Sequence, residues 1–127
     1  MALTNDTGYN SRPAAADYSA IKWPRLVVTN TSGEYATCGA GAMPHGVGQN
    51  FPLKQGEQLR ASSIEGREEK CEVGAGGVTV GAKVYSDANG KLVVSATVGH
   101  IPVGIALEAA ANGEVAKFEY RTLPANT

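Results

Sequence analysis

The chain contains an internal repeat, and this repeat limits the possible folds more than any other feature. A short β-branched run, a turn ending in Gly, a loop, a Pro-x-Gly-Val/Ile segment and a Gly-Glu pair occur twice in the same order. Val27, Asn30, Gly33, Pro44, Gly46, Gly56 and Glu57 are matched by Val84, Asp87, Gly90, Pro102, Gly104, Gly113 and Glu114. Such self-similarity is the signature of one supersecondary unit present twice. We predict two similar units, at about residues 21–64 and 78–121, with a connection at 65–77.

Each unit is predicted to be built from β-strands. Short apolar runs at 25–29, 58–64, 83–86, 102–108 and 114–120 are separated by turns such as Asp87-Ala-Asn-Gly90, a strong hairpin signal. No window of about 11 residues carries a helical stripe with caps. A chain of 127 residues is of single-domain length. We predict an all-β fold, with residues 21–127 forming one small β-barrel or β-sandwich-like domain.

The first 20 residues lack both strand and helix periodicity, and they are polar and rich in Ala. We interpret residues 1–20 as an extended N-terminal arm outside the repeat. Such an arm adds little to the core, and its deletion (residues 2–20) should leave the β domain folded. It holds Tyr9, Arg12 and Tyr18, which we treat as candidate partner-binding residues because Tyr and Arg often anchor interfaces. Trp23, which matches Val80 in the repeat, is expected to pack in the core.

Composition and charge argue against several classes of partner. The net charge is −1 and only 6% of residues are aromatic, so neither nucleic acid nor an anionic membrane is an expected partner. The N-terminus lacks a signal-peptide pattern and no apolar run approaches membrane-spanning length, which predicts folding in a cytosol. A reducing compartment predicts that Cys38 and Cys71 are free, semi-buried thiols.

The sequence contains no motif that indicates catalysis. His45 and His100 fall in corresponding loops, but two histidines without a ligand-spaced Cys or carboxylate do not make a metal site. Glu57 and Glu114 are interpreted as turn residues at strand starts. Lys91 follows a hairpin Asn-Gly, so a swinging-arm carrier domain is a minor alternative. We expect no catalytic, cofactor-binding or metal-binding residues, and a binding or structural protein in place of an enzyme.

The ordered pattern of the second half resembles a known family. Val78-x-x-Gly81-x-x-Val84-x-x-Asp87-x-x-Gly90-Lys91, Pro102-Val-Gly-Ile-Ala-Leu-Glu108 and Gly113-Glu114 resemble the small capsid decoration (cement) proteins of tailed bacteriophages. The first half carries the matching Pro44-His-Gly-Val-Gly-Gln-Asn50 and Gly56-Glu57, so the resemblance covers about residues 25–120.

This resemblance implies a viral structural protein that binds the outer surface of the mature capsid and stabilises it. The implied partner is the major capsid protein, the implied oligomer is a homotrimer, and the implied location is the virion surface after assembly in the host cytoplasm. A small-molecule, glycan or carrier-type β binding module is the competing interpretation. Another structural component of a phage head or tail is a third.

Overall fold

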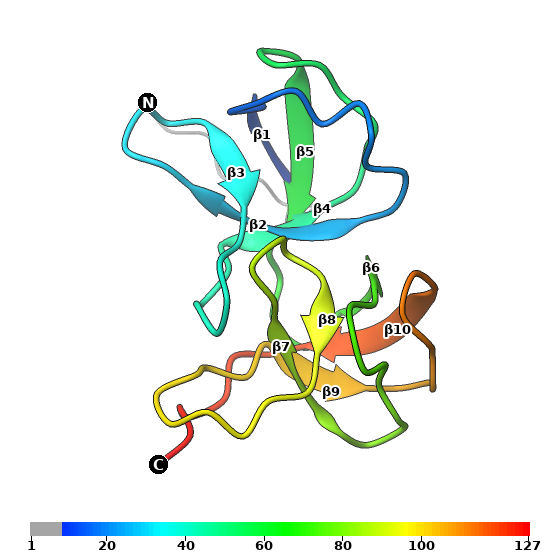
Figure 1. Cartoon of the computed structure of the whole chain (residues 1–127). Coiled ribbons are helices and arrows are strands. Elements are labelled where there is room, and N and C mark those ends of the chain that lie inside the picture. Colours follow the sequence, from blue (N-terminus) through cyan, green and yellow to red (C-terminus); the bar gives the residue numbers. More distant parts are fainter. Residues whose placement is uncertain (1–8) are drawn as a thin grey trace.

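The computed structural model describes residues 9–127, and these residues form ten β-strands and no helix (Figure 1). The first five strands are β1 (Tyr9–Pro13), β2 (Arg25–Thr29), β3 (Tyr35–Thr37), β4 (Gly46–Gly48) and β5 (Gln58–Ser62). The second five are β6 (Glu68–Glu72), β7 (Lys83–Ser86), β8 (Leu92–Val93), β9 (Gly104–Ala106) and β10 (Val115–Tyr120). The prediction of an all-β fold is confirmed.

The two halves of the chain form sheets of identical topology. The strand orders are β1-β5-β4-β2-β3 and β6-β10-β9-β7-β8, and all named strand pairs are antiparallel. The Pro-x-Gly segments supply the equivalent strands β4 and β9. The first unit lies in the upper half of Figure 1 and the second in the lower half. Two repeated β units are therefore present, as the sequence pattern predicts.

Each sheet curls until its two edges approach one another. A parallel bridge joins Ala14, directly after β1, to Tyr35 at the start of β3, and the equivalent bridge joins Val73 to Leu92. The right-handed twist of antiparallel sheets favours this curling. Because the edges meet, fewer backbone groups are left open to pairing with other chains. Each unit therefore resembles a small barrel closed at one point.

The structural repeat is longer than the sequence pattern predicts. β1 pairs with β5 over five residues, in the same position that β6 takes beside β10, and Ala14 is fully buried. Residues 9–14 are thus part of the first unit and not an arm outside it; residues 1–8 lie outside the described residues. Because deletion of residues 2–20 would remove this edge strand, we now expect it to destabilise the first barrel. As an edge strand, β1 has mostly exposed side chains, so it carries no apolar alternation.

The buried core residues of the two units also lie at equivalent positions of the repeat. Ile21, Val27, Tyr35, Leu59 and Ala61 are buried in the first unit, and Val78, Val84, Leu92, Ala116 and Phe118 are buried 57 positions later. Strand alternation explains this match, because residues two apart point to the same face. Inward-facing positions are therefore equivalent in the two barrels.

Several side chains of the first unit pack into the core of the second unit and thereby join the two barrels. On β2, Val27 packs inside the first barrel, whereas its neighbour Leu26 packs with the core of the second. Cys38 and Val47 join Leu26 there, and all three are fully buried. β2 and β4 therefore bury residues on both faces, and the hydrophobic contact between the units is continuous with the second core.

Candidate functional site

The paired glutamates of the repeat bind the backbone of their own turns. Glu57 Oε1 accepts a hydrogen bond from the Lys54 N–H at 2.6 Å, and Glu114 Oε1 accepts one from the Ala111 N–H at 2.7 Å. Bonds from side chain to local backbone stabilise turns. The prediction that both glutamates are turn residues is confirmed, and each carboxylate serves structure.

Lys91 is held by its surroundings. Asp87 Oδ1 accepts hydrogen bonds from the N–H groups of Asn89 and Lys91 at 2.8 and 2.9 Å, and Asn30 makes the same two bonds in the first unit. Lys91 Nζ lies 3.4 Å from Glu72 Oε2. A carrier lysine must extend freely into solvent, so this ion pair removes the support for a carrier domain.

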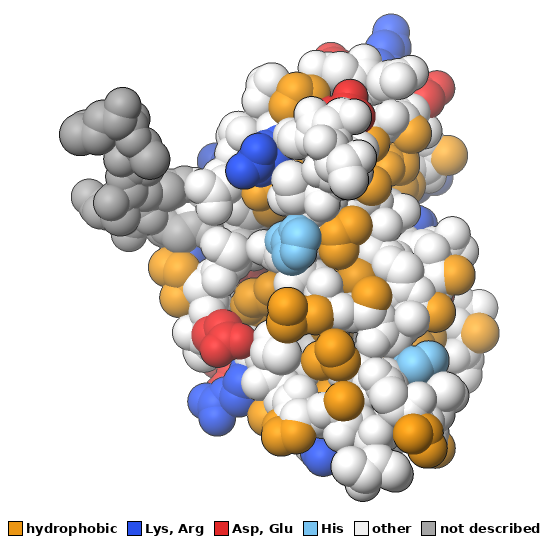
Figure 2. Space-filling model, turned by 90° about the vertical axis from the view of Figure 1, so that its left-hand side faces the viewer, with side chains coloured by type: hydrophobic (Ala, Val, Ile, Leu, Met, Phe, Trp, Pro, Cys, Tyr) orange, Lys and Arg blue, Asp and Glu red, His pale blue; other side chains and the backbone are white. Residues whose placement is uncertain are grey.

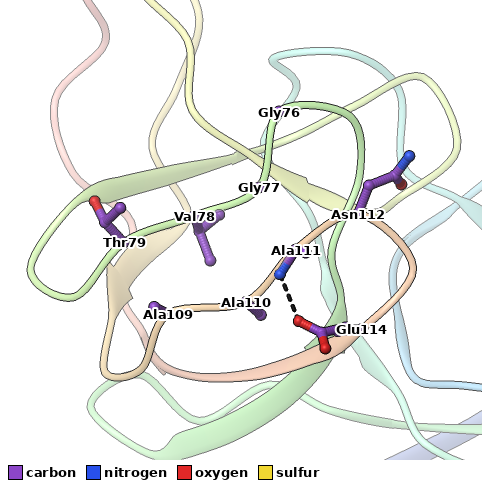
Figure 3. A pocket seen from close by; sticks show the side chains of 9 residues that line it. All are labelled: Gly76, Gly77, Val78, Thr79, Ala109, Ala110, Ala111, Asn112 and Glu114. Atoms are coloured by element: carbon purple, nitrogen blue, oxygen red, sulfur yellow. Dashed lines mark hydrogen bonds between the residues drawn. The ribbon is translucent and has the colours of Figure 1, made fainter.

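An open hollow in the second unit is lined mostly by backbone and small side chains (Figure 3). Its volume is about 540 Å³, and its lining residues are Gly76, Gly77, Val78, Thr79, Ala109, Ala110, Ala111, Asn112 and Glu114. A smaller hollow of about 180 Å³ occupies the equivalent place in the first unit, beside Glu57. Glu114 is the only ionisable residue lining the larger hollow, and its carboxylate is already engaged. These hollows follow from the repeat and contain no nucleophile paired with a base.

The three candidate partner-binding residues are not adjacent to one another. The Tyr9 ring lies on β1 close to two guanidinium groups: Arg60 Cζ is 4.2 Å and Arg67 Cζ is 5.3 Å from the ring centroid. Arg12 is exposed further along β1, where its Nη1 donates to the Gly33 carbonyl at 3.4 Å. β1 thus presents both residues, but toward different neighbours.

Tyr18 has a role inside the chain. Its ring packs edge-on against Phe51 with the centroids 5.8 Å apart, and its hydroxyl accepts a hydrogen bond from the Thr37 N–H at 3.3 Å. The ring is half-buried against the first core. Tyr18 therefore covers an edge of β3, a contact that sequence reasoning missed because Tyr18 and Thr37 lie in different parts of the chain.

Trp23 is 49% exposed, and the expectation that it packs in the core is wrong. Its repeat partner Val80 is 67% exposed, so the match in sequence is real but the position points outward in both units. The inward position nearby is taken by Ile21 and by Val78.

An exposed apolar surface arises where two equivalent loops meet. The loop 39–45 of the first unit and the loop 94–101 of the second are joined by the Ile101 N–H, which donates to the Gly41 carbonyl at 2.9 Å. Met43, Val94 and Val98 are 48%, 51% and 73% exposed. Figure 2 shows hydrophobic side chains gathered on this side of the molecule, around the two histidines. We call Met43, Val94 and Val98 the loop face.

The two histidines border the loop face in different ways. His45 Nδ1 accepts a hydrogen bond from the Thr29 N–H at 2.8 Å, while the ring stays exposed. His100 lies 2.9 Å from Ser95 Oγ, and its ring covers Gly41 so closely that a Cβ there would be 2.2 Å from it. Each histidine ring therefore holds its own loop in place through these contacts. Among residues 9–127, no group of three or more His, Cys, Asp or Glu side chains is arranged to hold a metal ion.

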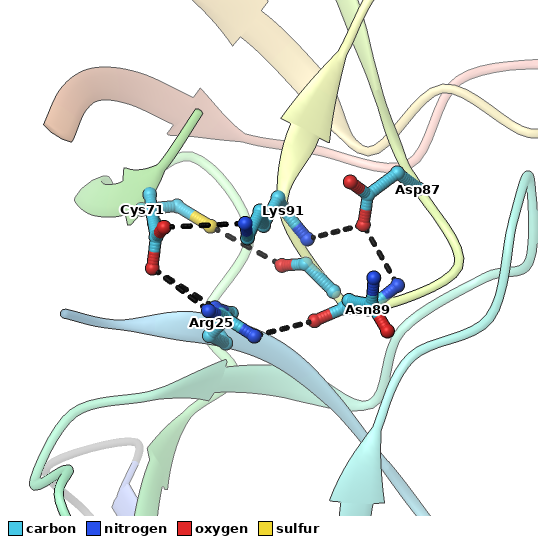
Figure 4. A network of polar contacts seen from close by, with 7 residues as sticks. Arg25, Cys71, Asp87, Asn89 and Lys91 are labelled. Carbon is cyan, nitrogen blue, oxygen red and sulfur yellow. Dashed lines mark hydrogen bonds and ion pairs between the residues drawn. The ribbon is translucent and has the colours of Figure 1, made fainter. Parts of the chain in front are cut away.

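A cluster of charged groups connects the two barrels where β2 meets β6 (Figure 4). Glu72 on β6 pairs with Arg25 on β2 at 3.0 Å and with Lys91 at 3.4 Å, and Arg25 also donates to the Asn89 carbonyl. The Arg25 and Glu72 side chains are only 12% and 11% exposed. Because the pair is largely shielded from water, it resists screening by salt better than a surface pair.

Both cysteines are free, as the sequence predicts, but they are completely buried and not semi-buried. Cys71 is completely buried, and its thiol lies 3.5 Å from the Gly90 carbonyl. Burial raises the pKa of both thiols above the ordinary cysteine value, so they stay protonated and unreactive in the folded protein. In the described part of the chain, no helix has the length and apolar character needed to cross a membrane.

Comparison with known proteins places the chain among phage head proteins. The family model of the phage cement proteins matches residues 12–121. The N base of the head fiber protein gp8.5 of bacteriophage phi29 has a similar fold, with a TM-score of 0.66 and 16% identity over 91% of this chain and 98% of that one. No curated protein matches the chain. The family match spans both barrels and nearly all strands: the chain belongs to the phage cement proteins and is a structural protein associated with the phage capsid.

Proposed function

We propose that the protein binds the outer surface of the mature capsid as a homotrimer and stabilises the shell, with the major capsid protein as its partner. The observation that carries this proposal is the cement-family match over residues 12–121, which covers both barrels. A protein that binds only the mature shell stabilises it by its binding free energy, multiplied over many copies. Trimers add several linked contacts and therefore raise avidity.

The internal construction of the protein suits a static role. The two barrels share buried contacts through Leu26, Cys38 and Val47, and the Glu72 ion pairs join them at the edge. The repeated carboxylates are used within turns, which supports a structural protein without enzymatic activity. Two buried, protonated thiols fit a chain that folds in the reducing host cytoplasm before it joins the virion surface.

We further propose that partner contacts use the surfaces described above. Tyr9 and Arg12 are presented by the edge strand β1, and Tyr18 stabilises the neighbouring edge. The loop face supplies apolar area of the kind that contacts between copies bury. The net charge of −1 does not favour nucleic acid as the main ligand, and the small hollows do not favour a small molecule.

Mature shells of the encoding phage, assembled without this protein, provide the test. The wild-type protein should co-sediment with mature shells and raise the temperature at which they release DNA, and unexpanded precursor shells serve as the control. Sedimentation equilibrium of the free protein measures its oligomeric state. Failure to bind mature shells contradicts the proposal, and a monomer both in solution and on the shell contradicts its trimeric part.

A second candidate is a base for a longer head appendage. The fold likeness to the head fiber base of phi29 favours it. Both candidates require capsid binding, but only the second requires that another protein attach to the bound molecule. Electron microscopy of decorated shells separates them, because a cement protein ends at its two barrels whereas a fiber base carries further density.

A further inference from the structure

We propose that Arg60 and Arg67, both held close to the Tyr9 ring, form a site for the carboxylates of an acidic segment of the capsid partner. We call Tyr9, Arg60 and Arg67 the guanidinium site. The inference rests on the proposed function, and it specifies the surface and the chemistry of the contact.

The guanidinium site is built on the outer face of the first barrel. In the β1–β5 register Tyr9 lies opposite Ser62 and Ser11 opposite Arg60, so Tyr9 and Arg60 are diagonal neighbours on one face. Leu59 and Ala61, on either side of Arg60 along β5, point into the core. Strand alternation therefore directs Arg60 outward, where its side chain is exposed.

Arg67 reaches the same ring from the connection between the barrels. It follows a turn in which its N–H donates to the Ile64 carbonyl, and it comes directly before β6. Both guanidinium carbons lie within the range of about 6 Å in which a cation is attracted to an aromatic face. Because β5 and β6 belong to different units, the joined barrels fix the spacing of the two charges.

These two arginines lie near one aromatic ring, and neither forms a salt bridge with a carboxylate that the structure describes. The salt bridges among residues 9–127 use Arg25, Lys91, Lys117 and Arg121, and none engages Arg60 or Arg67. Two like charges are thus held near one ring, and no carboxylate among residues 9–127 forms an ion pair with either of them. An incoming carboxylate offsets their repulsion and forms paired N–H···O bonds with a guanidinium.

The size of the site favours a protein segment over nucleic acid. Phosphate-backbone binding relies on many Lys and Arg contacts along a basic surface. This chain has a net charge of −1, and the guanidinium site is a local exception to that balance. Tyr and Arg are also the residue types that most often carry the binding energy of protein interfaces. A short acidic segment therefore fits the site better than a nucleic acid strand.

The first experiment measures binding of charge variants to mature shells that lack this protein. The double variant Arg60→Gln with Arg67→Gln should bind at least about tenfold more weakly than wild type, as expected when charged interface contacts are truncated. Arg60→Lys with Arg67→Lys should recover only part of the affinity, since lysine keeps the charge but loses the planar fork. Lys54→Gln with Lys83→Gln, at two exposed lysines, removes the same charge elsewhere and should bind within about twofold of wild type.

The second experiment identifies the chemistry of the occupant. Hexaglutamate should displace the wild-type protein from shells, whereas hexaglutamine and an oligothymidylate of equal length should not. Melting temperatures of all variants confirm that each is folded. Equal binding of the Gln and wild-type proteins overturns the inference alone, whereas lack of wild-type binding overturns the proposed function itself. Stronger displacement by the oligothymidylate assigns the site to nucleic acid, and loss of self-association in the Gln variant assigns it to contacts between copies; either result overturns the inference.

Discussion

We predict that the repeated Pro-x-Gly segment requires glycine because neighbouring atoms leave no room for a Cβ atom. A positive φ is not the reason. Gly46 and Gly104 occupy equivalent positions on β4 and β9, and neither has a positive φ. A Cβ added at Gly104 would lie 2.0 Å from the Glu119 carbonyl oxygen and 2.9 Å from Phe118 Cδ2. At Gly46 the nearest atom, the Ser62 carbonyl oxygen, would be 2.8 Å away.

These distances set the order of the expected effects. Ordinary contact begins at 3.4 Å, so Gly104→Ala must displace the β10 backbone by more than an ångström, whereas Gly46→Ala requires about half that shift. Overpacking costs typically about 1–3 kcal/mol, and each ladder hydrogen bond that the displacement breaks adds about 1 kcal/mol. We expect a loss of about 3 kcal/mol in the free energy of unfolding for Gly104→Ala and about 1–2 kcal/mol for Gly46→Ala.

Chemical denaturation followed by Trp23 fluorescence and circular dichroism measures both losses. Gly39→Ala is the matched control, because a Cβ there meets nothing within 4 Å and the position has no positive φ. This control should leave the free energy of unfolding unchanged or raise it by up to about 1 kcal/mol, since Ala restricts the unfolded chain. If Gly104→Ala is as stable as wild type, or if Gly39→Ala loses as much as Gly104→Ala, the steric explanation of the motif is refuted.

Three further predictions concern ionisable groups. Glu72→Gln should lower the free energy of unfolding by about 2–3 kcal/mol in denaturant titrations, because it leaves the shielded Arg25 without its partner. Ellman's reagent should modify neither Cys38 nor Cys71 in the folded protein and both after unfolding; rapid reaction of the native protein would contradict their burial. Burial raises the pKa of Tyr120 to about 12. Since the unfolded value is about 10, stability should fall by about 2–3 kcal/mol between pH 10 and 12, in addition to a decline from the thiols, and Tyr120→Phe should lessen the fall measured above pH 10.

Part of the fold follows from local pattern. The hairpin Asp87-Ala-Asn-Gly90 forms as predicted, with Asp87 accepting hydrogen bonds from the turn backbone. The same bonds recur at Asn30, because the residue types recur. Turn chemistry depends on residues within four positions of one another, so a sequence read alone is informative about it.

The edge strands β1 and β6 could not be predicted from local sequence patterns. β1 contains no apolar alternation, and its place beside β5 depends on residues almost 50 positions away. The sequence pattern predicts a connection at 65–77, yet β6 forms there, and its Glu69 and Glu72 are buried at the junction of the barrels. An edge strand packs little of its own surface, so its sequence contains little evidence of where it pairs.

The candidate site depends on the same long-range pairing. Tyr9 was singled out by its residue type, but neither Arg60 nor Arg67 was, because nothing in the local sequence places them beside it. Trp23 shows the opposite failure: its hydrophobicity and its match to Val80 predicted burial, whereas both positions face outward. Residue type alone does not specify direction, and one position along a strand reverses the face.

Three properties of this protein can be read from its sequence: it is all-β, it contains one unit repeated at an interval of 57 to 58 residues, and it resembles the phage cement proteins. These properties reside in turns, alternation and motif order, which are local. Only the tertiary structure decided that residues 9–13 complete the first barrel, that Leu26 packs into the second, and that two arginines meet at Tyr9. Those outcomes depend on sheet register and on the docking of two curved sheets, where contacts form between residues far apart in the chain.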